Sequence, residues 1–304
     1  MARRKGARAE RATFDRMNDE TPRSPGEAAR LAQRTVWAAA ARGWIEDREA
    51  LLAGMTPVTA RLIELAAIAP GQAVLDIASG SGDPAFSIAS VVGPAGRVDG
   101  FDLVPEMVAG AQAIARARAT ENVTFRAVAS ELDIGGADIT YDAITCRFGL
   151  MFMPDPAAAL RTWRSSLRPG GRIALSTWAE FPVLRVVRDV VARRAPVPDV
   201  DPSAPGILAL PTPDRLRAVL EQAGYEDVAV ETLELPLFDD LPADQWWDLM
   251  ARTAGPLVML LAALPEETRS IVRADGIEVL GARHPSGVVS ERGVALIASA
   301  VHRG

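Results

Sequence analysis

A glycine-rich turn and a following aspartate carry the clearest chemical pattern in this sequence. The apolar run 74–77 is followed by Gly80, Gly82 and Pro84. Glycines here permit positive φ angles and leave bare backbone for a ligand, and proline suits the start of a helix. Together with Ala85 and with Asp102, about 20 residues further on, the glycines fit the loose dinucleotide fingerprint. The pattern predicts a strand, a loop that binds a nucleotide-like ligand, and a helix.

Further motifs favour S-adenosylmethionine over a dinucleotide. Asp76 lies inside the strand that approaches the loop, and segments 98–102, 141–155 and 167–172 follow in order. With residues 75–82, these segments resemble the motifs of class I S-adenosylmethionine-dependent methyltransferases. The branch they resemble most is that of the ubiquinone and menaquinone C-methyltransferases, and the likeness covers roughly residues 70–180.

This resemblance implies a cofactor site, and two of its positions depart from the family. Ala78 stands where the family usually has its first glycine, and Ala129 where an aspartate usually lies near the adenine. Asp102 has two oxygens that can accept from the ribose hydroxyls, although it could instead cap a helix. Asp76 either contacts the cofactor or only orients the loop. The expected cofactor-binding residues are Asp76, Ala78, Ser79, Gly80, Gly82, Asp102, Leu103, Met107, Ala129, Ser130, Cys146 and Arg147.

The resemblance also implies that the methyl acceptor meets the cofactor at the end of the fourth strand. Arg147 could hold an acidic or carbonyl-bearing acceptor there, or pair with Asp155 at the surface. A general base would help a phenol, enol or activated carbon to react, and the candidate catalytic residues are His284, His302 and Glu180. The expected acceptor-binding residues are Trp37, Trp44, Arg147, Phe148, Trp178, Trp246, Trp247 and Met250. They suit an apolar aromatic, quinone, polyketide or terpenoid acceptor.

Alternating strands and helices must bring these residues together. Alternation at this spacing predicts parallel strands with helices on both faces, and loops that gather at the carboxyl edge. The predicted fold is α/β, a doubly wound seven-stranded Rossmann-like sheet, and the resemblance implies that its last strand is antiparallel. The expected strands are 73–77, 97–102, 123–128, 141–146, 171–178, 227–235 and 293–302.

Five segments are predicted along the chain. They are a disordered basic tail (1–23), an N-terminal helical lid (24–69), the cofactor-binding core (70–240), an inserted helical cap (241–287) and the last core strand (288–304). The second lid helix is expected to begin at Thr56-Pro57, and the cap to hold helices 242–264 and 265–280. The apolar cap residues either line the acceptor pocket or form a second small core or a homodimer face.

Composition excludes several classes of protein. The 304 residues are 49% hydrophobic, carry a net charge of −6 and include one cysteine and two histidines. The acidic balance argues against a nucleic-acid partner, and no motif typical of a metal site appears. No apolar run is long enough to span a membrane, so a cytoplasmic protein with a small-molecule partner is expected.

Four alternatives to a small-molecule methyltransferase stay open. They are an NAD(P)-dependent oxidoreductase, a fold relative that catalyses a cyclisation with bound S-adenosylmethionine, a non-enzymatic cofactor-binding protein, and a nucleic-acid methyltransferase. The last is disfavoured because the chain lacks a base-flipping Asn/Asp-Pro-Pro-Tyr motif.

Overall fold

The computed structural model describes residues 22, 24–134, 140–197, 199, 201, 204–237 and 240–304. The basic tail predicted at residues 1–23 lies almost wholly outside these residues. None of the helices in the described ranges combines the length and the apolar character that crossing a bilayer requires.

A seven-stranded sheet forms the centre of the molecule, in the order β3-β2-β1-β4-β5-β9-β6. The first five strands in sequence are parallel, and β9 is antiparallel to both of its neighbours, β5 and β6. The predicted doubly wound α/β sheet with an antiparallel last strand is therefore confirmed. The strands are β1 (Ala73–Ile77), β2 (Arg97–Asp102), β3 (Val123–Ala127), β4 (Tyr141–Arg147), β5 (Leu167–Glu180), β6 (Glu226–Pro236) and β9 (Arg292–Val301).

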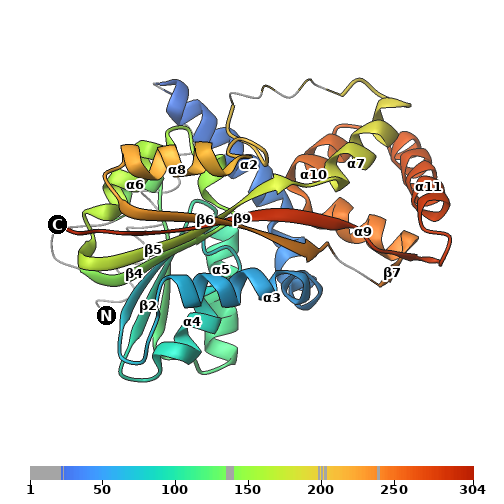
Figure 1. Cartoon of the computed structure of the whole chain (residues 1–304). Helices are drawn as coiled ribbons and strands as arrows, with labels where there is room; N and C mark the ends of the chain where they lie inside the picture. Colours follow the sequence, from blue (N-terminus) through green and yellow to red (C-terminus); the bar gives the residue numbers. More distant parts are fainter. Residues whose placement is uncertain are drawn as a thin grey trace.

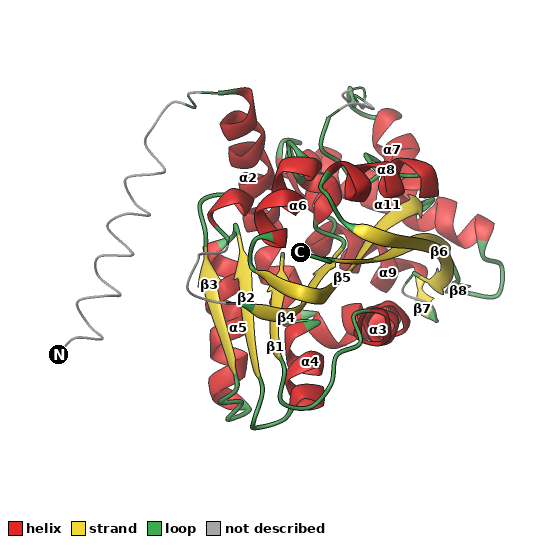
Figure 2. Ribbon diagram, turned by 60° about the vertical axis from the view of Figure 1, so that its left-hand side comes forward, coloured by secondary structure: helices red, strands yellow, loops and turns green. Residues whose placement is uncertain are grey.

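Successive side chains of the central strands pack on opposite faces of the sheet. In β1, Val74 joins the core cluster formed with α3, α4 and α5, whereas Leu75 joins the cluster formed with α6 and α8. This alternation is the expected behaviour of a strand that is buried on both faces. The helices that flank the core, seen in Figures 1 and 2, are α4 (Ala85–Val92), α5 (Pro105–Ala117), α6 (Pro156–Arg164), α7 (Val183–Ala192) and α8 (Pro213–Gln222).

The N-terminal segment forms two helices, α2 (Pro25–Glu46) and α3 (Arg48–Leu65). The prediction that the second helix begins at Thr56-Pro57 is wrong, because Pro57 lies inside α3. Buried residues at helical spacing, among them Leu51, Val58 and Leu62, hold the preceding turns against the sheet. That burial outweighs the single backbone hydrogen bond that proline removes.

A helical insertion fills residues 241–289, between β6 and β9, and lies at the right of Figure 1. It holds α9 (Ala243–Thr253), α10 (Gly255–Ala262) and α11 (Glu266–Arg283), and is closed by a small ribbon of β7 (Leu241–Pro242) and β8 (Val288–Val289). The expected single helix 242–264 is broken at Ala254, whose backbone is extended. Pro256 has no N–H to donate to the carbonyl of Arg252, so an unbroken helix through this position would lack that hydrogen bond. The packing is also close here, because a Cβ on Gly255 would lie 2.7 Å from Val36 of α2.

Candidate functional site

A large cavity lies at the carboxyl edge of the sheet, where β1, β2, β4 and β5 end. Its walls come from the loops after these strands and from α2, α3, the end of β6 and the α9–α10 junction. The predicted site residues that line it are Trp37, Trp44, Ala78, Gly80, Asp102, Leu103, Met107, Arg147, Phe148, Trp178 and Met250.

The glycine-rich turn after β1 is held tightly between β2 and β4. The N–H of Ser79 donates to the carbonyl of Phe101 (3.1 Å), which ties the turn to the end of β2. Ala78, at the position where the family usually has glycine, adopts a φ of 56°. A non-glycine residue in this region is strained, and such strain clusters at functional sites. Gly80 has a φ of 52°, and the space where its Cβ would stand is open.

Asp102 ends β2 beside this turn and lines the cavity. Its Oδ2 accepts from the N–H of Gly80 (2.8 Å) and its Oδ1 from the N–H of Val104 (2.9 Å). Burial raises the pKa of Asp102 above its ordinary value, and these amide hydrogen bonds oppose the rise. Each oxygen keeps a lone pair, so the carboxylate can accept from two hydroxyls in the cavity.

Three of the predicted cofactor residues lie beneath the cavity wall. Asp76 is fully buried and accepts from the Thr145 hydroxyl (2.7 Å), while its Oδ2 has no hydrogen-bond partner. Burial raises the pKa of Asp76 to about 7, although the bond from Thr145 and the charge of Arg147 oppose the rise. Ser79 and Cys146 are also fully buried, and burial raises the pKa of the Cys146 thiol to about 12. A neutral buried thiol is a core residue rather than a nucleophile.

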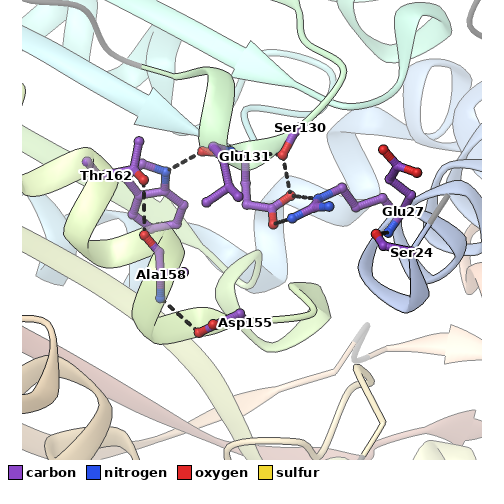
Figure 3. A network of polar contacts seen from close by, with 10 residues as sticks. Ser24, Glu27, Ser130, Glu131, Asp155, Ala158 and Thr162 are labelled. Atoms are coloured by element: carbon purple, nitrogen blue, oxygen red, sulfur yellow. Dashed lines mark hydrogen bonds and ion pairs between the residues drawn. The ribbon is translucent and has the colours of Figure 1, made fainter.

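The loop after β3 differs from its prediction. Neither Ala129 nor Ser130 lines the cavity; Ser130 caps a short 3₁₀ helix, η1 (Glu131–Asp133), by accepting from the N–H of Leu132 (3.0 Å). Glu131 lines the cavity instead, and its two oxygens accept from the Arg30 guanidinium of α2, each at 2.7 Å. Figure 3 shows Glu131 pointing toward α2, while its carbonyl accepts from the indole N–H of Trp163 (3.0 Å).

Aromatic rings form the wall of the cavity on the side of β4 and β5. Phe148 and Trp178 stack with ring centroids 4.2 Å apart and an interplanar angle of 3°. Phe181 packs on Trp178 at 4.9 Å. Phe148 also has a positive φ, 56°, directly after Arg147. This wall presents flat apolar surface, and β1 separates its strands from β2, which ends at Asp102.

Two arginines interrupt this apolar side. Arg147 is 8% exposed and donates to the Thr59 hydroxyl (2.7 Å) and to the carbonyl of Asp83 (3.0 Å). Arg48, also 8% exposed, pairs with the Asp83 carboxylate. Burial lowers the pKa of both arginines to about 10, and for Arg48 the charges of Arg118 and Arg147 lower it further. Both guanidinium groups therefore stay charged at neutral pH. Arg147 does not pair with Asp155, which caps α6.

Helix α2 closes the cavity from above with two tryptophans. Trp37 packs edge-to-face on Trp44 (6.1 Å) and on Phe152 (5.2 Å). The indole N–H of Trp44 donates to the carbonyl of Thr253 in the helical insertion (2.8 Å). A Cβ on Gly43 would overlap the backbone of Arg252, so the two helical segments are in direct contact. The two tryptophans thus line the cavity, and Trp44 also contacts the insertion.

The predicted catalytic residues do not line the cavity. His284 and Glu291 interact at the end of the insertion (3.2 Å), and Glu180 is exposed. His302 contacts the carbonyl of Leu167 (2.8 Å) at the amino end of β5, on the edge of the sheet opposite the cavity. These residues were proposed from their types, but the fold places all three outside the lining of the cavity.

Trp246 and Trp247 belong to the interior of the insertion. Trp246 is fully buried and its indole N–H donates to the carbonyl of Leu237 (3.3 Å). Trp247 lies so close to Gly276 of α11 that a Cβ there would overlap its ring. Neither tryptophan lines the cavity, and both belong to the core cluster that also holds residues of α3, α4, α5 and the sheet, so they do not form a separate second core.

The sequence analysis missed several residues that line the cavity or contact its walls. Phe101 and Val128 lie next to predicted strand ends and could have been found from the strand boundaries. Arg48 comes from α3, which no motif includes. Thr59, also of α3, does not line the cavity but accepts a hydrogen bond from Arg147. Only the packing of α3 across β4 and β5 brings them to the site.

The residues present fit S-adenosylmethionine. Gly80 leaves open backbone at the turn, Asp102 offers acceptors to a ribose, and Phe101, Met107 and Val128 provide apolar walls for an adenine. Within the described residues, no three His, Cys, Asp or Glu side chains are grouped so as to hold a metal ion.

Comparisons with known proteins identify the family of the chain. The model of the ubiE/COQ5 methyltransferase family matches residues 59–186. The arsenite methyltransferase of Halobacterium salinarum is 36% identical over 170 residues, 54% of this chain and 40% of that protein. The crystal structure of the [4+2]-cyclase SpnF has a TM-score of 0.51 at 20% identity and covers 82% of each chain, which shows a shared fold alone.

The chain spans only 40–59% of the length of several curated relatives that it matches. A longer match is the ubiquinone/menaquinone biosynthesis C-methyltransferase UbiE of Ectopseudomonas mendocina, 32% identical over 185 residues. That match covers 56% of this chain and 72% of the UbiE protein. The resemblance found in the sequence motifs is confirmed by these matches: the chain belongs to the ubiE/COQ5 methyltransferase family.

Proposed function

We propose that this chain transfers a methyl group from S-adenosylmethionine to a small, largely apolar acceptor of aromatic, quinone, polyketide or terpenoid type. One observation carries the proposal. A single continuous cavity has Asp102 and Gly80 on one side and the stacked rings of Phe148 and Trp178 on the other. Such a cavity suits two ligands that must meet at its middle, beside the ends of β1 and β4.

The chain's own residues position the reactants in this proposal. Asp102 accepts from the ribose hydroxyls, the apolar residues around Met107 enclose the adenine, and bare backbone at Gly80 faces the amino-acid part of the cofactor. S-adenosylmethionine, when bound, supplies an electrophilic methyl group for an in-line displacement, which depends on orientation and on the exclusion of water. The tryptophans of α2 would exclude water, which makes α2 a lid over the cofactor and the insertion a cap over the acceptor.

General-base catalysis has little support among the cavity-lining residues that the structure describes. They include no histidine, and their carboxylates are Asp83, Asp102 and Glu131. Asp83 and Glu131 pair with arginines, and Asp102 accepts from backbone amides. The cavity therefore favours an acceptor that needs no proton removed by the protein at the moment of transfer.

The test is a calorimetric titration of the full chain with S-adenosylhomocysteine, with NADH and NADPH titrated in parallel. Saturable binding of S-adenosylhomocysteine alone is expected. Acceptors would then be screened by mass spectrometry for the gain of one methyl group. Binding of a nicotinamide cofactor alone would instead indicate an oxidoreductase.

Two further outcomes would redirect the proposal. A product without added mass would indicate a cofactor-bound cyclisation, the alternative that shares this fold. Failure of all three ligands to bind would indicate a non-enzymatic role.

A further inference from the structure

Two buried arginines stand in the otherwise apolar acceptor side of the cavity. Arg48 of α3 and Arg147 at the end of β4 both line it, and each is 8% exposed. Burying a guanidinium is unfavourable unless its N–H groups are paired. The pairing here is incomplete, because the Nε of Arg48 is buried without a hydrogen-bond partner.

The local charges do not balance. Asp83 is the one described carboxylate that pairs with Arg48, and its carbonyl, not its carboxylate, accepts from Arg147. The second hydrogen bond of Arg147 goes to the neutral hydroxyl of Thr59. Asp76 is the next carboxylate, but it accepts from the Thr145 hydroxyl and forms no ion pair with either arginine. Within the described residues the two cations therefore share one ion-paired carboxylate, and an anionic ligand would supply a second negative charge.

The order of the strands places Arg147 away from Asp102, and Asp83 holds Arg48 close to Arg147. Asp102 ends β2 and Gly80 follows β1, whereas Arg147 ends β4, which lies on the other side of β1. The stacked rings of Phe148 and Trp178 continue the same wall toward β5. Arg147 therefore lies between the glycine turn and a flat aromatic surface, and Arg48 pairs with Asp83 at the end of the same turn.

We propose that Arg48 and Arg147 form a carboxylate-binding subsite for the methyl acceptor, which is an organic acid with a flat apolar body. The guanidinium groups would hold the carboxylate, and the Phe148–Trp178 wall would hold the rings. This inference rests on the proposed methyl transfer, since it concerns the acceptor of that reaction. The same carboxylate chemistry is present in the amino-acid part of the cofactor, so the test must separate the two sources.

The test compares 2-naphthoate with its neutral analogue 2-naphthamide, titrated into the full chain saturated with S-adenosylhomocysteine. We expect 2-naphthoate to bind about tenfold to a hundredfold more tightly, as charge-assisted hydrogen bonds give. Arg48→Met should reduce this preference to less than about threefold. The double variant Arg48→Met/Asp83→Asn removes the carboxylate that the single variant leaves buried and unpaired, so it serves if the single variant does not fold.

Arg118→Met is the matched control. Arg118 and Arg48 both lie over the Phe86 ring, at 5.3 and 5.5 Å from its centroid, but Arg118 is exposed and does not line the cavity. This variant should keep the preference for 2-naphthoate. Arg48→Lys, which keeps the charge, should restore part of the preference that Arg48→Met loses.

The cofactor arm titrates S-adenosylhomocysteine and 5′-methylthioadenosine, which lacks the amino-acid part. If Arg48→Met abolishes the preference for S-adenosylhomocysteine over 5′-methylthioadenosine, the arginines serve the cofactor and the proposal is overturned. Equal affinity of the native chain for 2-naphthoate and 2-naphthamide would also overturn it. A failure of the proposed function is recognised separately, because S-adenosylhomocysteine itself would not bind. The two naphthalene probes are then titrated into the ligand-free chain, where they still report on the subsite.

Discussion

The two sides of the cavity are built in different ways. On the side of β1 and β2, the cavity is lined by backbone groups and one carboxylate. These residues come from short segments around Gly80 and Asp102. On the side of β4 and β5, side chains do the work, and Arg48, Arg147 and Trp178 come from distant parts of the chain. A site built from local backbone geometry can therefore be recognised from short sequence motifs. A site built by the packing of distant segments cannot.

The first prediction asks whether the β4 side depends on a buried ion pair. Arg48→Met leaves the Asp83 carboxylate, 6% exposed, without its partner. We expect the free energy of unfolding to fall by about 3–5 kcal/mol, measured by urea denaturation. Adding Asp83→Asn should recover most of the loss. Arg118→Met is the control, and a single variant as stable as the native chain would show that this pair is not a structural element.

The second prediction concerns the β1 side and the effect of its buried carboxyl group, Asp76, on the pH dependence of stability. The pKa of Asp76 is raised from 3.8 to about 7, so the folded chain keeps a proton that the unfolded chain releases between about pH 4 and pH 7. The stability that this carboxyl contributes is therefore present at low pH and lost as pH rises through that window. Asp76→Asn keeps an acceptor for Thr145. Between pH 4 and pH 8, the free energy of unfolding of this variant should rise by up to about 4 kcal/mol relative to that of the native chain.

Urea denaturation of both proteins across this pH range is the measurement for Asp76. Subtracting the native curve from the variant curve removes the titration of all other groups. A difference that does not change with pH would show that Asp76 is ionised throughout, and the two sides would then both rest on buried charges.

The third prediction separates the two sides by ligand. Asp102→Ala should weaken S-adenosylhomocysteine binding by about 1.5–3 kcal/mol, because charged hydrogen bonds to the ribose are lost. Calorimetry measures this, and circular dichroism checks the fold, since Asp102 also accepts from Gly80 and Val104. An unchanged dissociation constant would remove the ribose role from Asp102.

The fourth prediction changes the acceptor side instead of the cofactor side, and its expected effect is the smallest. Trp178→Leu removes the ring that stacks on Phe148 and should weaken 2-naphthamide binding by about 1 kcal/mol, while S-adenosylhomocysteine binding stays the same. Fluorescence or calorimetric titration checks both. Equal losses for the two ligands would mean that the sides are not independent and would break the comparison.

Sequence reasoning predicted the sheet well because each parallel strand and its helix form a local unit. The strand 73–77 and the strand 97–102 match β1 and β2 exactly in range, and the antiparallel last strand followed from the family resemblance. It failed at Pro57 and at Ala254, where burial against other elements decides the backbone. Local patterns do not contain those contacts.

The same limit explains the site. Asp102 was found because its spacing from Gly80 is fixed by one strand-helix-strand unit. Arg48 was missed because only the packing of α3 across the sheet brings it to the cavity. His302 was proposed from its residue type, yet the antiparallel direction of β9 carries it to the opposite edge of the sheet.

The position of the helical insertion has a consequence for how this chain could diverge or be redesigned. The insertion begins and ends at neighbouring antiparallel strands, β6 and β9, so a segment of different length can replace it without changing the register of the sheet. Its contacts with Gly43 and Trp44 show that the matching face of α2 must be exchanged with it. A chimaera that takes both segments from one relative would therefore keep the contact between them and the register of the sheet.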